Sequence, residues 1–337
     1  MNKKTFKTVL STVAAAVALS ACTMIPKYEQ PQVEVAETFK YDTFDDGIRA
    51  ADLGWQDFFA DPRLHRLIDI ALERNTDLRT AALNAEIYRK QYMIARNDLL
   101  PSINASGTGT RVGSLSGGIT RSEYTVGLGA AAYELDLFGR VRSNSQAALQ
   151  GYFSVAANRD AAHLALIAAV AKAHFNELYA QESMALAQRV LKTREATYKL
   201  SQMRHKAGVI SAVDLRQQEA LIESAKADYA NAVKNREQAR NALATLINQP
   251  LPEDLPAALP LSKQFKITRL PAGLSSEVLL NRPDIRAAEH SLKQANANIG
   301  AARAAFFPSI SLTGSVGTAS GELSGLFKSG TGIWAFA

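Results

Sequence analysis

Cysteine is almost absent from this sequence. The single cysteine among the 337 residues is Cys22, so no disulfide within the chain can stabilise the fold. Three lysines in the first seven residues precede a small, apolar stretch from Val9 to Leu19, which is the pattern of a secretory signal. That stretch is too short to cross a bilayer as a stable helix. The tetrapeptide Leu19-Ser20-Ala21-Cys22 fits the lipobox of bacterial lipoproteins at every position.

The lipobox predicts the fate of the cysteine. Residues 1–21 are interpreted as a signal peptide that is cleaved between Ala21 and Cys22, with a covalent lipid on the Cys22 thiol. The alternative is an ordinary signal peptide that carries a cysteine by chance. Several acyl chains anchor a protein stably. Thr23 stands where an aspartate would usually retain a lipoprotein in the inner membrane. Residues 22–62 are therefore predicted to anchor the chain to the outer membrane, from which it extends into the periplasm.

The chain also lacks a strong charge of one sign and a second long apolar run. Three of the six net positive charges belong to signal lysines, so the mature chain is not expected to bind nucleic acid. No segment after Cys22 approaches 18 consecutive apolar residues, which argues against a later transmembrane helix. Any membrane crossing beyond the anchor would have to be made by β-strands.

Proline is missing between Pro101 and Pro250, and glycine is rare after Gly139. The stretch is rich in strong helix formers, and its length predicts a coiled coil or a repeat rather than one globular helix. Residues 140–247 are interpreted as a long antiparallel helical hairpin with its tip at 205–211. Small and apolar residues spaced by three, four and seven form a narrow seam that includes Leu164, Ala168, Ala171, Leu178, Leu186, Val190, Leu200, Ile222, Ala225, Ala239 and Leu243.

Residues 101–137 alternate with a period of two, which predicts strands. Tyr124, Val126 and Leu128 share one face, and Thr125, Gly127 and Tyr133 share the other. A flexible turn at 113–118 joins this strand to the one before it. The modest apolar face suits a strand with lipid on one side and a polar lumen on the other, although a soluble hairpin fits equally well.

The sequence repeats itself at an offset of 207 residues without a gap over about 30 positions. The repeat predicts a first unit at 63–250 with a helix, two strands and the long hairpin, then a linker at 251–274. The second unit, at 275–337, has a helix at about 275–305, a strand at 308–318 and the start of another at 331–337. Its hairpin is missing, so we expect either a C-terminally truncated chain that is impaired as a channel or a fragment of a longer protein. Open sheet edges are not tolerated in hydrocarbon, so several chains must close one barrel.

Three segments carry a resemblance to a known family. Residues 133–142 (YELDLFGRVR), 279–289 (LLNRPDIRAAE) and 295–310 (ANANIGAARAAFFPSI) are similar to motifs of the outer membrane factors, the TolC and OprM family of efflux lipoproteins. The resemblance implies an α+β membrane protein in which a homotrimer builds a twelve-stranded transmembrane β-barrel and a periplasmic α-barrel from long antiparallel α-helical hairpins. It also implies docking to a periplasmic adaptor protein and an inner-membrane efflux pump, with export of drugs and amphiphiles.

The resemblance makes the hairpin tip the candidate adaptor-docking site, against the alternative of a plain solvated turn. The tip comprises Arg204, His205, Lys206, Gly208, Val209, Ile210 and Ser211. No catalytic, metal or cofactor site is expected. His163 and His174 are about 16 Å apart along a helix, too far to share a metal ion, and are interpreted as surface or seam residues. Two other functions fit the sequence less well: a periplasmic adaptor lipoprotein, and a structural coiled-coil lipoprotein without a pore.

Overall fold

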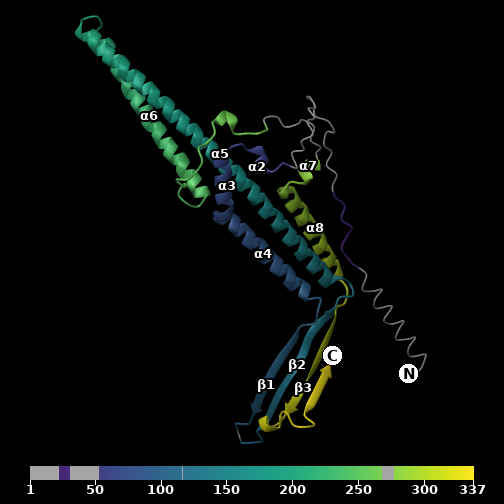
Figure 1. Cartoon of the computed structure of the whole chain (residues 1–337). Coiled ribbons are helices and arrows are strands. Elements are labelled where there is room, and N and C mark those ends of the chain that lie inside the picture. Colours follow the sequence, from purple (N-terminus) through teal and green to yellow (C-terminus); the bar gives the residue numbers. More distant parts are fainter. Residues whose placement is uncertain (1–22, 31–52, 116, 268–276) are drawn as a thin grey trace. The chain divides into compact units, whose positions relative to one another are not determined.

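The computed structural model describes residues 23–30, 53–115, 117–267 and 277–337 (Figure 1). The signal peptide, Ala21 and Cys22 lie outside the described residues, so lipidation at Cys22 stays a prediction. The chain divides into two compact units. Unit 1 draws on residues 1–33, 84–156 and 286–337, and unit 2 draws on residues 34–83 and 157–285. Each unit therefore contains segments of both predicted repeats.

The bounds of the helices and strands reproduce the predicted repeat. Helix α4 runs from Thr76 to Asn97 and helix α8 from Pro283 to Ala304, so both have 22 residues and begin 207 positions apart. Strands β1 (Ile103–Val112) and β3 (Ile310–Ser320) also begin 207 positions apart. The chain thus encodes the same helix-to-strand unit twice.

The helix predicted at about 275–305 begins later than expected. The structure has a short helix, α7 (Glu277–Leu280), and α8 then starts at Pro283. Proline has no backbone N–H, and it disfavours the helical conformation in the residue before it. Pro283 therefore suits the first position of a helix and separates α7 from α8.

The long hairpin is confirmed, with α5 at Arg140–Lys206 and α6 at Ala212–Leu246. The predicted seam is buried in α6 at Ile222, Ala225, Ala239 and Leu243. In α5 the prediction is only partly right. Ala171 and Leu178 are buried, whereas Leu164, Leu186, Val190 and Leu200 are each more than two-fifths exposed. In the core of unit 2, the buried face of α5 also includes Leu166, Ile167 and Val170, which the seam did not contain, because α3 packs there.

The core of unit 2 joins three helices. Helix α2 (Trp55–Phe58) precedes α3 (Pro62–Arg74), whose apolar face packs against α5 and the end of α6. The residues 251–267, predicted as part of a linker, are also attached: they contain the 3-10 turn η2 (Leu261–Lys263) and a bridge between Phe59 and Phe265. The core residues are Phe59, Leu64, Leu67, Ile68, Ile70, Ala71, Leu166, Ile167, Val170, Ala171, Leu243 and Ile247.

Unit 1 contains one antiparallel sheet with the strand order β1-β2-β3-β4. Strand β2 spans Arg121–Leu135 and β4 spans Gly332–Phe336, and the turn η3 (Leu323–Gly325) lies between β3 and β4. The first strand of the second repeat begins at Ile310 instead of 308. No helix in the described part of the chain is both long enough and apolar enough to cross a membrane.

Candidate functional site

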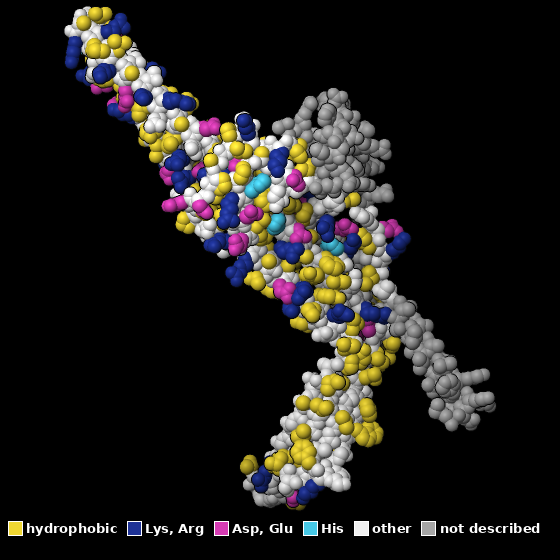
Figure 2. All heavy atoms as spheres, in the orientation of Figure 1, with side chains coloured by type: hydrophobic (Ala, Val, Ile, Leu, Met, Phe, Trp, Pro, Cys, Tyr) yellow, Lys and Arg dark blue, Asp and Glu magenta, His cyan; other side chains and the backbone are white. Residues whose placement is uncertain are grey.

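The register of the four strands gives the sheet one apolar face. Ala105 pairs with Leu128, Leu128 with Val316, and Val316 with Trp334, so these four side chains lie in one row. The neighbouring rows continue the pattern with Val126, Ile103, Leu312, Ile310, Tyr124 and Phe336. Leu128, Val316 and Trp334 are more than half exposed. Figure 2 shows that charged side chains on the strands lie near the loops, whereas on the helices charged side chains are scattered over the surface.

The opposite face of the sheet is polar. A hollow of about 370 Å³ on this face is lined by hydroxyl and amide side chains from three strands, among them Asn104, Ser106, Thr108, Thr125, Thr313 and Ser315. Gly127 and Gly317 pair directly within it. A Cβ on Gly127 would lie 2.8 Å from the Val316 carbonyl oxygen and 3.1 Å from the Gly317 Cα, so the two backbones approach more closely than side chains would allow.

A β-bulge in β2 corrects one prediction about these faces. Strict alternation places Tyr133 on the polar face, but Tyr133 pairs with Leu312 two positions before Gly314, which pairs with Ala130. One extra residue is therefore inserted into β2, where Ala132 has a φ of 50°. The bulge returns Tyr133 to the apolar face, and its hydroxyl donates to the Leu99 carbonyl at 3.2 Å.

The turn from β2 into α5 is fixed by one carboxylate. Asp136 accepts hydrogen bonds from the backbone N–H groups of Val141 (3.0 Å) and Arg142 (2.9 Å), which caps the N-terminus of α5. The Arg142 Nε also donates to Asp136 at 3.0 Å, while Arg140 pairs with Glu134 through two contacts. This pairing explains the charged residues in the 133–142 motif: they lock the end of a strand to the start of a helix.

An aromatic stack joins this turn to the helix-to-strand turn of the second repeat, between α8 and β3. Phe138 follows β2 and Phe307 follows α8, and their rings are 4.5 Å apart with planes at 15°. Gly139, at φ 77°, permits the backbone to reverse after Phe138. The stack holds the segments that follow β2 and α8 together at one end of the sheet.

Hydrogen bonds fix the backbone of the hairpin tip, which belongs to unit 2. The Val209 N–H donates to the Arg204 carbonyl and the Gly208 N–H to the His205 carbonyl, both at 2.9 Å. These two bonds form a Schellman motif around Gly208, whose φ is 74°. His205 Nδ1 lies 3.1 Å from the Ile210 carbonyl, so the imidazole crosses the turn as a donor. The predicted tip residues are therefore brought together by one turn.

The second helix begins with a capping box. The Ser211 hydroxyl accepts from the Asp214 N–H at 3.1 Å, and Asp214 accepts from the Ser211 N–H at 3.1 Å. The Ser211 hydroxyl and backbone bonds lower the pKa of Asp214 below its ordinary value. The rigid turn leaves Val209 and Val213 more than 60% exposed beside Arg204 and Lys206. A basic surface with exposed apolar side chains at its centre is of a kind that can bind another protein.

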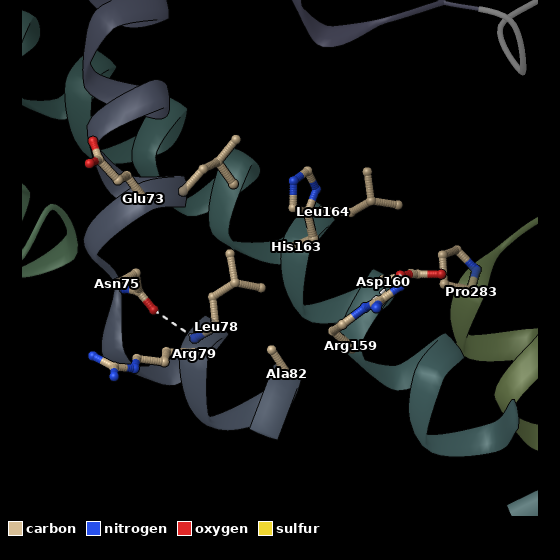
Figure 3. A pocket seen from close by; sticks show the side chains of 11 residues that line it. Glu73, Asn75, Leu78, Arg79, Ala82, Arg159, Asp160, His163, Leu164 and Pro283 are labelled. Atoms are coloured by element: carbon tan, nitrogen blue, oxygen red, sulfur yellow. Dashed lines mark hydrogen bonds and ion pairs between the residues drawn. The ribbon is translucent and has the colours of Figure 1, made fainter. Parts of the chain in front are cut away.

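A second surface of unit 2 is a groove of about 680 Å³ (Figure 3). Its walls come from α3, α4 and α5, and Asn75 caps α4 there by accepting from the Leu78 N–H at 3.0 Å. Leu72, Leu78, Ala82 and Leu164 give it apolar walls, and the Arg159–Asp160 ion pair lies near Pro283. Leu164, expected in the buried seam, lines this open groove.

The histidine predicted at the surface or seam, His174, is fully buried in a polar cluster of unit 2. The Asp61 carboxylate accepts from His174 Nε2 (3.0 Å), Gln264 Nε2 (3.0 Å) and the Leu259 N–H (3.1 Å). Its other oxygen accepts from the Arg63 N–H at 2.8 Å, which caps α3. Sequence analysis missed the cluster because its members lie up to 203 residues apart, although Asp61 before Pro62 is a helix-start signal.

Burial and hydrogen bonding tune both titratable groups of this cluster. Burial lowers the pKa of His174, although Asp61 and Glu177 oppose that shift. For Asp61, burial alone would raise the pKa, but the bonds from Gln264, His174 and two backbone N–H groups lower it overall. The described residues contain no group of three or more His, Cys, Asp or Glu side chains that could hold a metal ion. The cluster therefore joins the α3 start, α5 and the 251–267 segment structurally.

Comparison with known proteins gives one consistent result. The family model described as outer membrane efflux protein matches residues 67–249 and 274–337. The chain is 43% identical to the probable efflux pump outer membrane protein TtgC of Pseudomonas putida, over 98% of this chain and 70% of that protein. It is 41% identical to the outer membrane protein OprJ of Pseudomonas aeruginosa, over 97% of this chain and 70% of that protein.

Solved structures agree. The crystal structure of the open state of the Neisseria gonorrhoeae MtrE outer membrane channel matches with a TM-score of 0.87 and 73% identity, over 94% of this chain and 71% of that chain. The predicted fold class, with long helical hairpins and antiparallel strands, is confirmed by this likeness.

Proposed function

This chain belongs to the outer membrane efflux protein family, and on that premise we propose how its copies assemble and what passes through them. It is an outer-membrane channel component of an efflux system. We propose that it performs no covalent chemistry and requires no cofactor beyond the lipid on Cys22. Transport would be driven by partner proteins, with selectivity set by the width and lining of the channel.

The observation that carries the proposal is the two-faced sheet with two edges. Within the part of the chain that the structure describes, strands β1 and β4 each have a neighbour on one side only. In a bilayer an unpaired edge would leave several backbone groups without partners, at a cost of several kcal/mol for each group. Three copies that pair β4 of one with β1 of the next would close a twelve-stranded barrel. The apolar face would then meet lipid, and the hollow lined by Ser106, Thr125 and Ser315 would face water.

The helices support the same assembly. Leu186, Val190 and Leu200 repeat at seam spacing in α5 but are between 43% and 55% exposed in one chain. Exposed apolar rows of this kind mark surfaces that another protein covers. We propose that they face sister subunits in a periplasmic tunnel, and that the apolar groove of Figure 3 is covered in the same assembly.

For partners and substrates, the proposal is a homotrimer in a tripartite multidrug efflux system. It would receive drugs and amphiphiles from a periplasmic adaptor protein and an inner-membrane pump, and release them outside the cell. The basic, apolar-centred tip at 204–211 is the proposed adaptor-docking surface.

Two measurements test the channel itself. Protein purified from outer membranes should migrate as a trimer that dissociates on heating, and it should conduct ions in planar bilayers. A structural coiled coil without a pore would form oligomers without conductance. A single-copy species that stays soluble after removal of the lipid would contradict the assembly.

Docking at the tip is tested by charge reversal. The double variant Arg204→Glu/Lys206→Glu should weaken crosslinking to the adaptor while the trimer persists. The matched control is Lys192→Glu/Arg194→Glu, which reverses two exposed charges on the same helix about 20 Å from the tip. Crosslinking that stays at the unaltered level in the tip variant would refute the docking site, as would equal losses in both double variants.

A further inference from the structure

The segment that follows the predicted lipid site is seated on α8. Asn296 Nδ2 donates to the Pro26 carbonyl at 2.7 Å, and the Lys293 ammonium lies 5.3 Å from the centre of the Tyr28 ring. Ile25 packs against Gly300. Residues 28, 26 and 25 thus meet positions 293, 296 and 300 in turn, so the segment runs antiparallel to α8. Towards its N-terminus it heads for the end of the helix and β3.

The contact between the segment and α8 is so close that it requires glycine at position 300. A Cβ at Gly300 would lie 2.5 Å from the Ile25 Cγ1 and 2.8 Å from both the Cα and the N of Ile25. Two of these atoms are backbone, so no rotamer change of Ile25 would remove the clash. Any other residue at position 300 must push the segment off the helix.

The repeat supplies an internal comparison. Helix α4 is the counterpart of α8, with the same length and an offset of 207 residues. Where α8 has the buried small residues Ala297, Gly300 and Ala304, α4 has Lys90, Met93 and Asn97. Arg89 stands where α8 has Asn296. The two helices thus differ at the positions that the segment contacts.

We propose that this face of α8 is a docking site for the lipid-anchored N-terminus, which holds the acylated Cys22 at the junction of α8 and β3. The proposal rests on the lipid anchor proposed above. Cys22 precedes Ile25 by three residues, a reach of about 10 Å. Gly300 precedes the last residue of α8 by four residues, or about 6 Å along the axis. The thiol can therefore reach the end of α8, which β3 follows.

This site gives the lipid a defined position. A free tether would let the acyl chains enter the membrane anywhere within its reach. A seated segment places them beside the first residues of β3, where Ile310 and Leu312 begin the apolar face. The lipid then sets the height at which the sheet meets the bilayer, in addition to retaining the protein there.

Trypsin provides the test, because Lys27 is the one lysine or arginine in the described part of the segment and lies between the two anchoring contacts. Cleavage after Lys27 in lipidated protein from outer membranes releases residues 22–27, which mass spectrometry identifies with or without acyl chains. Native-state cleavage follows local opening of the segment. Asn296→Ala removes one hydrogen bond and should raise the cleavage rate about fivefold. Gly300→Leu should raise it further.

Met93→Leu is the matched control, since it changes the α4 position equivalent to Gly300. It should leave cleavage after Lys27 unchanged. Cleavage at the unaltered rate in both α8 variants would overturn the docking site, as would an equal rise in the Met93 variant. Asn296→Ala decides the question if Gly300→Leu does not fold. A released peptide without acyl chains would instead contradict the lipid anchor itself.

Discussion

Phe138 and Phe307 stack face to face at 4.5 Å, although 169 positions separate them in the chain. Phe138 lies between β2 and α5 in the first repeat, and Phe307 lies between α8 and β3 in the second. The stack therefore ties the β2-to-α5 turn to the α8-to-β3 turn. It does so where the sheet meets the helices of unit 1.

Removing one ring tests this tie. Phe307→Ala should lower the free energy of unfolding by about 0.5–1.5 kcal/mol beyond the loss of buried area, because an aromatic pair is lost. Thermal and denaturant unfolding in detergent will measure the change. Phe306→Ala is the control, since the neighbouring ring is 89% exposed. Equal effects of the two substitutions would show that the stack contributes nothing specific.

The two faces of the sheet predict opposite responses to charge. Leu128→Arg places a guanidinium on the apolar face and should destabilise the folded protein in lipid by about 2–4 kcal/mol if the residue lies near the bilayer centre. Thr125→Arg introduces the same side chain on the polar face and should be tolerated while it alters ion selectivity. Folding into lipid vesicles under increasing urea and conductance in planar bilayers are the measurements. Tolerance of Leu128→Arg would contradict the assignment of the faces.

The buried histidine predicts an acid-sensitive helical core. The folded state lowers the pKa of His174 below its ordinary 6.5, so the unfolded chain binds more protons as the pH falls below that value. The stability from neutral His174 is present above about pH 6.5 and is lost as the pH falls towards the folded pKa. His174→Gln keeps a donor for Asp61 without titrating and should flatten this loss. Melting temperatures between pH 7.5 and 5 will show it.

His163 gives the control for that experiment. It lies on the same helix, outside the Asp61 cluster, so His163→Gln should leave the pH dependence of the melting temperature intact. If His174→Gln keeps the full acid loss, the buried histidine is not its source.

The turn at the hairpin tip depends on a left-handed backbone conformation at Gly208. Gly208 has a left-handed φ of 74°, which costs a residue with a side chain roughly 1–2 kcal/mol. Gly208→Val should therefore fray the tip, whereas Gly208→Asn should be milder, because asparagine visits this conformation. Hydrogen exchange at the Val209 and Gly208 positions will report opening. Identical exchange in both variants would mean that strain at this residue does not hold the turn.

The helices and strands of this chain were predictable where the local sequence determines them. The absence of proline predicted α5 and α6, and the repeat predicted α4 and α8 in the same register. The bulge at Ala132 was not predictable, since alanine carries no signal for a positive φ. Nor was the burial of His174, because its carboxylate partner arrives from 113 residues earlier in the chain. Both depend on tertiary packing that a local pattern does not contain.

The paired glycines of the polar face have one more consequence. Because neither Gly127 nor Gly317 can accept a methyl group without displacing the strand opposite, the close spacing of β2 and β3 at this point depends on these two residues. Alanine at both would force β2 and β3 apart, so any barrel made from such sheets would be wider at this level. The width of the pore in this protein can therefore be changed at one point, where Gly127 pairs with Gly317.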